Sequence, residues 1–399
     1  WEATGFDVTV QEQKKLAAKA KELGAELFVV DDGWFGQRHG IDNGLGDWYV
    51  NKEKFPNGID ELIDEVKAQG LLFGIWVEPE MVNPQSELYQ KHPDWIITQP
   101  KRTPILGRHQ EILDLTRPEV QAFEWDIIDK TLRPNPDITY VKWDCNRYIT
   151  QPGSSYLQPA DQSHLWIDYN RALYRLMDRF AKGFPNVMAM LCAGGSGRVD
   201  YGAMPYFHSF WPSDNTDPLG RIKIQWGFSH FFPANTISAH VTRMGKRHLK
   251  MAIDVALSGA FGIDLALDKA TAEERAQIAD AVKLYKERIR PLVMHGELYR
   301  LVSPYESPLA SLSYVSTDKQ KAVVYFYQTK DGNEPRVMLG GLDAQKKYRV
   351  EEVSLAKGVT SRFPANGKVF TGAELMEKGL ENPLNTQFES AVLILVANN

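Results

Sequence analysis

Hydrophobic positions along the first three quarters of the chain follow two patterns in turn, one typical of amphipathic helices and one of buried strands. Thr9 and Glu12 fit a capping box, and apolar residues within 16–23 then share one helical face before Gly24. Directly afterwards, residues 27–30 form a continuous apolar run. A strand that is apolar on both faces is typical of a parallel sheet covered by helices. The pattern therefore predicts a helix followed by a buried parallel strand.

The same helix-and-strand unit recurs along the chain. Residues 59–66 carry a helical stripe of apolar positions, and residues 71–76 supply the next buried strand. Thr271 and Glu274 form a second capping box, which opens a helix that is expected to end at Pro291. Further buried strands are predicted at 140–143, 187–191, 206–211, 236–241 and 263–267, with helices at 165–180 and 249–257.

This repeated alternation predicts an α/β fold of the (β/α)8 type, a TIM barrel, over residues 1–300. A doubly wound sheet is the alternative, but no glycine-rich dinucleotide fingerprint follows any predicted strand. Seven strands are predicted between residues 27 and 268, so the first barrel strand is expected to end near Trp1 and to be largely absent. Such a barrel would expose a sheet edge. We expect a homo-oligomeric partner, or a separate N-terminal portion, to cover that edge.

The pattern changes at about residue 301. Short β-rich segments at 322–327, 348–353 and 391–396 are separated by turn residues, and only 373–377 has a helical pattern. Residues 301–399 are therefore predicted to form a C-terminal all-β sandwich domain.

Composition excludes several classes of protein. The 399 residues are 43% hydrophobic and 24% charged, with a formal net charge of -5. These values exclude a disordered chain and a nucleic-acid binder that relies on positive charge. No apolar run approaches the roughly 18 residues of a membrane span, so no membrane partner is expected. The two cysteines exclude a disulfide framework, and the nine histidines form no HxH or HExxH pair, so no metal or cofactor is expected.

Tryptophan is unevenly distributed along the chain. All ten tryptophans lie between Trp1 and Trp226. A rigid, flat and amphipathic side chain confined to one part of the chain suggests a site for a ligand with flat faces, although a large core is an alternative explanation.

Acidic residues recur where the predicted buried strands end. A single carboxylate in such a place could equally cap the following helix. Four strand ends with acids, three of them with a tryptophan nearby, instead favour a carbohydrate site, because sugar hydroxyls bind charged acceptors and the ring face binds an aromatic surface. The residues concerned are Asp31, Asp32 and Trp34; Trp76, Glu78 and Glu80; Asp144; and Trp211, Asp214 and Asp217.

The segment YVKWDCNR carries the most specific signal for chemistry. Lys142, Asp144 and Asn146 are spaced two apart, so they share one side of a strand. A cation beside Asp144 would hold it ionised as a nucleophile, and a buried structural ion pair is the alternative. Hydrolysis with retention needs a second carboxyl group as proton donor. Asp214 and Asp217 are both candidates for this proton donor. Whichever of them is not the donor could cap a helix that begins near residue 219, and their spacing does not decide between them.

Nine segments carry a family resemblance: WEATGFD, FVVDDGWFG, GDWYVNKEKFPNGI, FGIWVEPEMVN, HPDWII, LGRHQEILDLTRPEV, YVKWDCNRYIT, CAGGSGRVDYG and FWPSDNTDPLGRIKIQWG. In this order, from residue 1 to about 245, they resemble glycoside hydrolase family 36, the α-galactosidases of clan D. The resemblance implies a retaining exo-α-galactosidase without cofactor that acts on α-galactoside oligosaccharides. It also implies a large β-sandwich domain before the barrel, which this chain does not contain.

The resemblance assigns roles to individual residues. It implies that Asp144 is the nucleophile and Asp214 the acid/base. The remaining residues would bind substrate: Asp31 and Asp32 at the 4- and 6-hydroxyls of galactose, Trp76, Arg108, Lys142 and Asn146 around the same sugar, Cys192 and Gly194 near its 2-hydroxyl, Trp34 in the pocket wall, and Asp217 beside the acid/base. An α-N-acetylgalactosaminidase or a galactosyl transglycosidase would use the same catalytic residues, and a non-catalytic sugar-binding module is the alternative from another class.

Overall fold

The computed structural model describes residues 1–244 and 248–398. It divides the chain into two compact units, each of which is described by itself. The first unit comprises Trp1–Trp211 with Ala266–Asp268, and the second comprises Pro212–Leu265 with Lys269–Asn399.

The apolar runs of the first unit form a parallel sheet. Among the described residues this sheet has five strands, which neighbour one another in chain order. The register places Trp76 of one strand opposite Lys142 of the next, and Trp143 opposite Leu191. The carboxyl ends of these strands therefore lie at one edge of the sheet. The strands are β1 (Leu27–Val30), β2 (Leu72–Val77), β5 (Ile138–Trp143), β6 (Met188–Leu191) and β7 (Ser209–Phe210).

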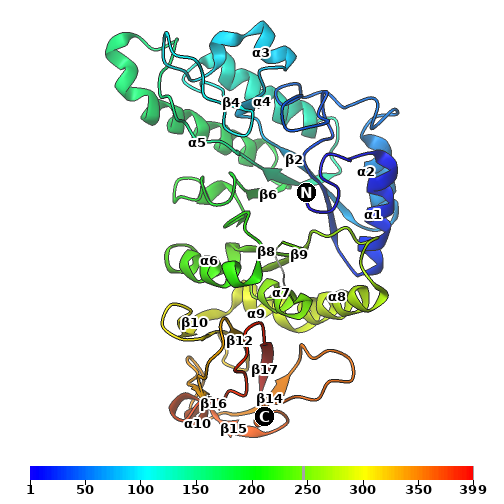
Figure 1. The fold of residues 1–399 in the computed structure, drawn as a ribbon, viewed down its shortest axis with the longest axis vertical. Coiled ribbons are helices and arrows are strands. Elements are labelled where there is room, and N and C mark those ends of the chain that lie inside the picture. The colour runs from blue at the N-terminus through cyan, green and yellow to red at the C-terminus, as the bar shows by residue number, and fades with distance from the viewer. Residues whose placement is uncertain (245–247, 399) are drawn as a thin grey trace. The chain divides into compact units, whose positions relative to one another are not determined.

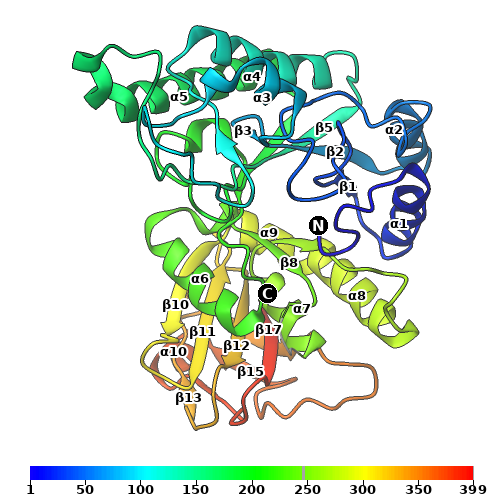
Figure 2. The same ribbon diagram turned by 45° about the horizontal axis from the view of Figure 1, so that its top comes forward.

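Helices connect these strands, as the spacing of apolar residues predicted. Figures 1 and 2 both show α1 beside α2 and α4 beside α5. Thr9 caps α1 by accepting from the N–H of Glu12 at 3.3 Å, and the helix stops before Gly24, whose φ of +86° is readily adopted by glycine. The elements are α1 (Val10–Glu22), α2 (Asp60–Ala68), α3 (Glu87–Lys91), η1 (Pro93–Trp95), α4 (Pro118–Leu132), η2 (Pro159–His164), α5 (Leu165–Gly183) and η3 (Met204–Tyr206), with β3 (Met81–Val82) antiparallel to β4 (Glu111–Ile112).

The second unit begins with α6 (Pro218–Phe231) and contains a parallel pair of strands, β8 (Ser238–Val241) and β9 (Ala260–Ile263). The predicted strand at 263–267 is wrong in its bounds, because the alternating run after Ile263 lies beyond the residues that pair with β8. The short helix η4 (Ala234–Thr236) precedes β8, and α7 (Leu249–Ala256) lies between β8 and β9 in the chain.

The helix predicted to end at Pro291 continues beyond that residue. Thr271 and Glu274 form the expected capping box at the start of α8 (Ala272–Leu284). A π-helical turn, η5 (Tyr285–Ile289), then leads into α9 (Arg290–His295). Pro291 lies in the first turn of α9, where its missing N–H and its fixed φ are tolerated.

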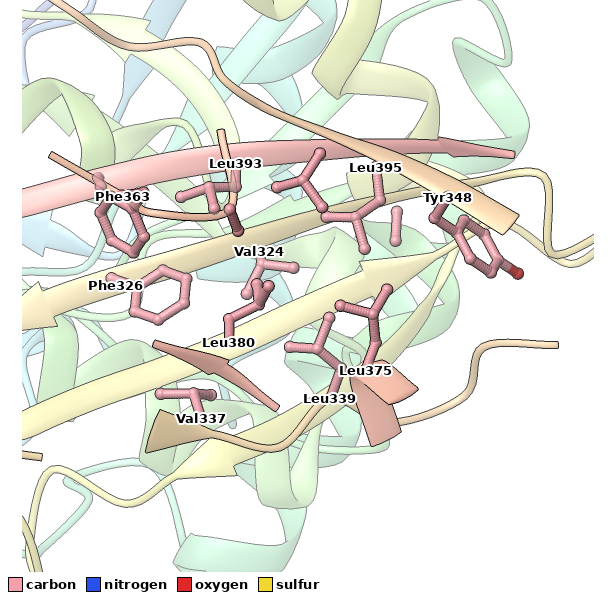
Figure 3. Packing of buried hydrophobic residues seen from close by; sticks show 14 of the residues in the cluster. Val324, Phe326, Val337, Leu339, Tyr348, Phe363, Leu375, Leu380, Leu393 and Leu395 are labelled. Atoms are coloured by element: carbon pink, nitrogen blue, oxygen red, sulfur yellow. The ribbon is translucent and has the colours of Figure 1, made fainter. Parts of the chain in front are cut away.

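The C-terminal part of the second unit is an antiparallel sheet. Its core lies between this sheet and a short β pair: in Figure 3, Val324 and Leu393 project from the sheet toward Val337 and Leu380. The six strands are, in spatial order, β10 (Glu297–Val302), β11 (Leu309–Val315), β12 (Lys321–Gln328), β17 (Ser390–Asn398), β14 (Lys347–Glu352) and β15 (Val369–Thr371); the short pair is β13 (Arg336–Val337) with β16 (Leu380–Glu381), and α10 (Gly372–Glu377) follows β15.

The C-terminal end of α7 is bound to this sheet through three tyrosines. Tyr314 donates to the carbonyl of Ser258 at 2.9 Å, Tyr325 to that of Leu257 at 2.8 Å, and Tyr327 to that of Asp254 at 3.1 Å. The last carbonyls of a helix have no partner within the helix itself. The hydroxyl of Tyr327 supplies such a partner to Asp254, and those of Tyr314 and Tyr325 bind the two carbonyls that directly follow the helix.

Candidate active site

The predicted site residues of the first unit gather at the carboxyl ends of its parallel strands. Asp31 and Asp32 directly follow β1, Trp76 lies near the end of β2, and Asp144 directly follows β5. Cys192 directly follows β6. Because the strands are parallel neighbours, residues that are far apart in sequence meet at one edge.

Asp144 lies at the centre of this group and is almost fully buried. Its Oδ1 accepts three backbone N–H groups: from Cys145 at 2.8 Å, Ala193 at 2.9 Å and Gly194 at 3.2 Å. Its Oδ2 accepts the indole N–H of Trp76 at 3.1 Å. Hydrogen bonds to a carboxylate favour its ionised form, so this environment is built for a charged Asp144.

Nearby charge acts in the same direction. Burial alone would raise the pKa of Asp144, but the Lys142 ammonium and the hydrogen bonds from Asn146, Trp76 and Cys145 hold it below its ordinary value. Lys142 donates to Asp31 Oδ2 at 2.6 Å. That ion pair also outweighs burial at Asp31 and lowers the pKa of Asp31. Lys142 thus lowers the pKa of Asp144, as the hypothesis of an ionised nucleophile requires, and the role of Asp144 stays a prediction.

Asp32 is held by an arginine from its own loop. Arg38 Nε and Nη2 donate to the two carboxylate oxygens of Asp32 at 2.9 and 2.8 Å, and Arg38 Nη1 donates to Asn83 Oδ1 at 3.1 Å. Burial raises the pKa of Asp32, and the charge and hydrogen bonds of Arg38 offset only part of that effect. Asp32 is therefore fixed in position by a buried bidentate pair.

The tryptophans near the site are packed into the core. Trp34, Trp76 and Trp143 are 2%, 1% and 0% exposed, so the expectation that they present open flat faces is wrong for these three. Trp34 Nε1 donates to the carbonyl of Trp76 at 2.9 Å. The ring of Phe35 stacks on that of Trp76, with 5.9 Å between the ring centroids. These rings support the end of β2, and Trp76 approaches Asp144 with its N–H edge.

A fourth carboxyl group, that of Glu78, is buried next to Asn146. Its Oε1 accepts the backbone N–H of Asn146, and the Asn146 side chain accepts from Arg108 Nη1 at 2.8 Å. Burial raises the pKa of Glu78 well above its ordinary value, and the negative charges of Asp144 and Asp32 raise it further. Arg108 is exposed, so it is the outermost of these groups.

The loop after β6 presents its backbone to Asp144. Ala193, Gly194 and Gly195 have φ values of 76°, 58° and 102°, all in the left-handed region. A non-glycine residue seldom adopts this conformation, so Ala193 is strained. The Cys192 side chain points into a small buried cluster with Met190 and Trp211. The two hydrogen bonds described from this loop to the carboxylate come from its backbone.

Asp214 and Asp217 belong to the second unit. Asp217 is the N-cap of α6, where its Oδ2 accepts from the N–H of Gly220 at 3.2 Å, as one of the two alternatives predicted. Asp214 is exposed and contributes negative charge at Arg221, whose pKa burial lowers to about 9. The pairing of Asp214 with Asp144, and a contact of Asp217 with substrate, stay predictions.

Sequence reasoning did not identify Arg38, and it gave Glu78 no individual role. Glu78 was noticed as an acid at a strand end, and its burial could not be read from that position. Arg38 lies in a loop without periodicity, six residues after its partner Asp32, so no spacing rule indicated it. The remaining site residues of the first unit are brought together as expected.

The described residues, 1–244 and 248–398, contain neither a candidate membrane span nor a candidate metal site. No helix in these ranges is both long and apolar enough to cross a membrane. Within the same ranges, no three histidine, cysteine, aspartate or glutamate side chains are grouped so that they could hold a metal ion.

Comparison with known proteins gives consistent matches over the whole chain. The protein-family model described as Melibiase matches residues 1–296, and the family model described as the glycosyl hydrolase family 36 C-terminal domain matches residues 309–395. Alpha-galactosidase AgaA of Geobacillus stearothermophilus is 42% identical over 392 residues, which are 96% of this chain and 52% of that protein. Alpha-galactosidase Mel36A of Lactobacillus acidophilus is 36% identical over 395 residues, again 96% of this chain and 52% of that protein.

Solved structures match equally well. The GH36 alpha-galactosidase AgaB of G. stearothermophilus has a TM-score of 0.92 at 40% identity, covering 100% of this chain and 54% of that one. A variant of AgaA from the same organism, in complex with raffinose, also has a TM-score of 0.92 at 40% identity and covers 100% of this chain and 55% of that one. The chain thus spans about half the length of the curated relatives that it matches.

Proposed function

Because this chain belongs to the melibiase family, we propose that it carries the catalytic residues of a retaining exo-α-galactosidase. The observation that carries the proposal is the buried carboxylate of Asp144, kept ionised by Lys142 and by four hydrogen bonds at the carboxyl edge of a parallel sheet. An ionised carboxylate that is shielded from water is what attack on an anomeric carbon requires.

The proposed reaction is a double displacement. Asp144 attacks the anomeric carbon while Asp214 donates a proton to the leaving glycosidic oxygen, which gives a covalent galactosyl-enzyme. Asp214 then takes a proton from water, which attacks the same carbon and releases galactose with its configuration retained. Oδ2 of Asp144 is the attacking oxygen, because it accepts one N–H whereas Oδ1 accepts three.

The galactose subsite follows from the same group of residues. The Asp31–Lys142 pair offers an acceptor and a donor to the 4- and 6-hydroxyls, and Asp32 adds a second acceptor fixed by Arg38. The remaining contacts are assigned to Trp34, Trp76, Arg108, Asn146, Cys192, Gly194 and Asp217. Since AgaA variants were solved with raffinose and stachyose, we propose α-galactosyl oligosaccharides of this type as substrates.

We also propose that residues 1–300 form a (β/α)8 barrel and that residues 301–399 form a β-sandwich domain. The parallel strands β1, β2, β5, β6 and β7, followed by the parallel pair β8 and β9, support the barrel. The two family models, which match residues 1–296 and 309–395, support the division.

One observation favours galactose over N-acetylgalactosamine. The curated relatives that the chain matches are named alpha-galactosidases, which supports galactose rather than its 2-acetamido derivative in this subsite. Side-by-side assays on an aryl α-galactoside and the matching α-N-acetylgalactosaminide test this preference. Faster turnover of the second substrate would reverse it.

The catalytic assignment is tested by two substitutions. Asp144→Ala should abolish turnover of an aryl α-galactoside without unfolding the protein, and substantial remaining activity would refute the assignment. Asp214→Ala should slow raffinose hydrolysis far more than hydrolysis of the aryl substrate, because a good leaving group barely needs a proton. Equal losses on both substrates would refute the acid role.

A further inference from the structure

A buried polar cluster lies behind the site and has no part in the proposed reaction. Glu80, which follows β2, is 1% exposed, and its Oε2 accepts from Arg198 Nη2 and from the Tyr169 hydroxyl, both at 2.5 Å. Glu124 of α4 is fully buried nearby, and neither of its oxygens has a hydrogen-bond partner among the described residues. The cost of removing two charges from water can exceed the attraction between them, so stability alone does not explain a buried ion pair of this kind.

Arg198 connects this cluster to the nucleophile along two routes. It belongs to the loop after β6, whose residues Ala193 and Gly194 donate their backbone N–H groups to Asp144. Its Nη2 also lies 3.3 Å from the thiol of Cys145, the residue that directly follows Asp144. Arg198 therefore belongs to one of the two segments that hold the carboxylate, and its guanidinium contacts the other.

The loop needs an external restraint. Ala193 has a φ of 76°, and such strain persists only where the surroundings over-determine the backbone. In this conformation the N–H groups of Ala193 and Gly194 point at Asp144. Between Ala193 and Asp200, Arg198 makes the charged contact to the buried core.

We propose that Arg198, through its buried ion pair with Glu80, is a positioning residue that holds the 193–198 loop so that two backbone N–H groups point at Asp144. The proposal rests on the function proposed above. Burial and the negative charge of Glu80 raise the pKa of Glu124 well above its ordinary value, and the charge of Arg198 opposes part of this effect. Tyr169 and Cys145 are the other titratable groups that face this pair.

The test compares Arg198→Met with a matched control, Arg117→Met. Arg117 also pairs with a carboxylate, Asp94 at 3.1 Å, and its side chain is 12% exposed against 20% for Arg198, but it contacts no residue of the loop. Both variants lose one ion pair of the first unit. Asp94 is 57% exposed whereas Glu80 is 1% exposed, so Arg198→Met is expected to lose more stability than Arg117→Met. Loss of positioning is therefore read from faster exchange that is confined to the loop peptides of Arg198→Met.

Two measurements are made on each variant. Hydrogen exchange followed by mass spectrometry on peptides covering 192–200 reports the loop without relying on turnover. The pH profile of kcat/KM on an aryl α-galactoside reports the ionisation of Asp144. For Arg198→Met we expect faster exchange in the loop, a kcat/KM roughly tenfold or more lower, and an acidic limb displaced to higher pH, because hydrogen bonds to a charged group are weakened.

The proposal would be overturned if the loop of Arg198→Met exchanged no faster than that of Arg117→Met. It would also be overturned if the loop exchanged faster but the acidic limb of the kcat/KM profile stayed in place. If Arg198→Met does not fold, Glu80→Gln replaces it, since the amide keeps an acceptor for Tyr169 and removes the charge. A failure of the function itself shows separately, as Asp144→Ala turning over substrate like the unaltered protein.

Discussion

The indole of Trp76 provides a direct test of how Asp144 is kept ionised. Trp76→Phe removes the N–H that donates to Asp144 Oδ2 at 3.1 Å and keeps an aromatic ring stacked on Phe35. A hydrogen bond to a charged group contributes about 1.5–3 kcal/mol. One pKa unit corresponds to about 1.4 kcal/mol, so the pKa of Asp144 should rise by about 1–2 units. Because Oδ1 of Asp144 keeps its three backbone donors, we expect the rise in the pKa of Asp144 to be near the lower end of this range.

The assay is the pH dependence of kcat/KM on an aryl α-galactoside, whose acidic limb reports the free enzyme. Because the pKa of Asp144 lies below its ordinary value, the unaltered protein retains its carboxylate at low pH. In Trp76→Phe the acidic limb should move to higher pH by about one unit. The rate on the plateau should change less, since Asp144 is ionised there in both proteins.

Trp34→Phe is the matched control. It makes the same change at a ring of similar burial and removes a 2.9 Å hydrogen bond to the carbonyl of Trp76, without contact to Asp144. It should cost about 1–3 kcal/mol of stability and leave the acidic limb in place. Equal displacement in both variants, or none in Trp76→Phe, would refute the argument that this bond sets the ionisation of Asp144.

Three further substitutions test other parts of the molecule. Arg38→Met leaves the buried carboxylate of Asp32 unpaired and should cost about 3–5 kcal/mol in urea unfolding, most of it recovered by adding Asp32→Asn; an unchanged midpoint would contradict the bidentate pair. Burial raises the pKa of Glu111 to about 7. The free energy of unfolding of the unaltered protein, relative to that of Glu111→Gln, should therefore fall as the pH rises from about 4.5 through 7. A difference that does not depend on pH would argue against that burial. Leu393→Ala empties a fully buried position in the C-terminal core and should cost about 2–5 kcal/mol by chemical denaturation, whereas a cost below 1 kcal/mol would mean that the core refills the space.

Much of the first unit could be predicted because its signals are local or follow from parallel strands. The apolar run at 27–30 and the capping residue Thr9 identified β1 and α1. Once the strands were taken as parallel, Asp31, Lys142 and Asp144 had to meet at one edge. These predictions needed no contact to be known in advance.

The contacts that could not be predicted join groups without a shared period. Arg38 binds Asp32 within one loop, and Glu80 receives Arg198 from a position 118 residues later. The strand predicted at 263–267 has the wrong bounds because a run of buried positions does not show which residues pair with β8. The helix end at Pro291 was wrong because proline is tolerated in the first turn that follows a π-helical turn.

The three tyrosines that bind the end of α7 have a consequence for the order in which the chain can mature. Their hydroxyls lie 56, 68 and 73 residues after the carbonyls that they satisfy. During synthesis, the end of α7 therefore leaves the ribosome well before β11 and β12 can cover it. Its carbonyls remain hydrated over that interval, and the segment is open to chaperones and proteases. A nascent chain halted at residue 300 should consequently remain protease-sensitive around residues 254–258, and protection should arise only when Tyr327 has emerged.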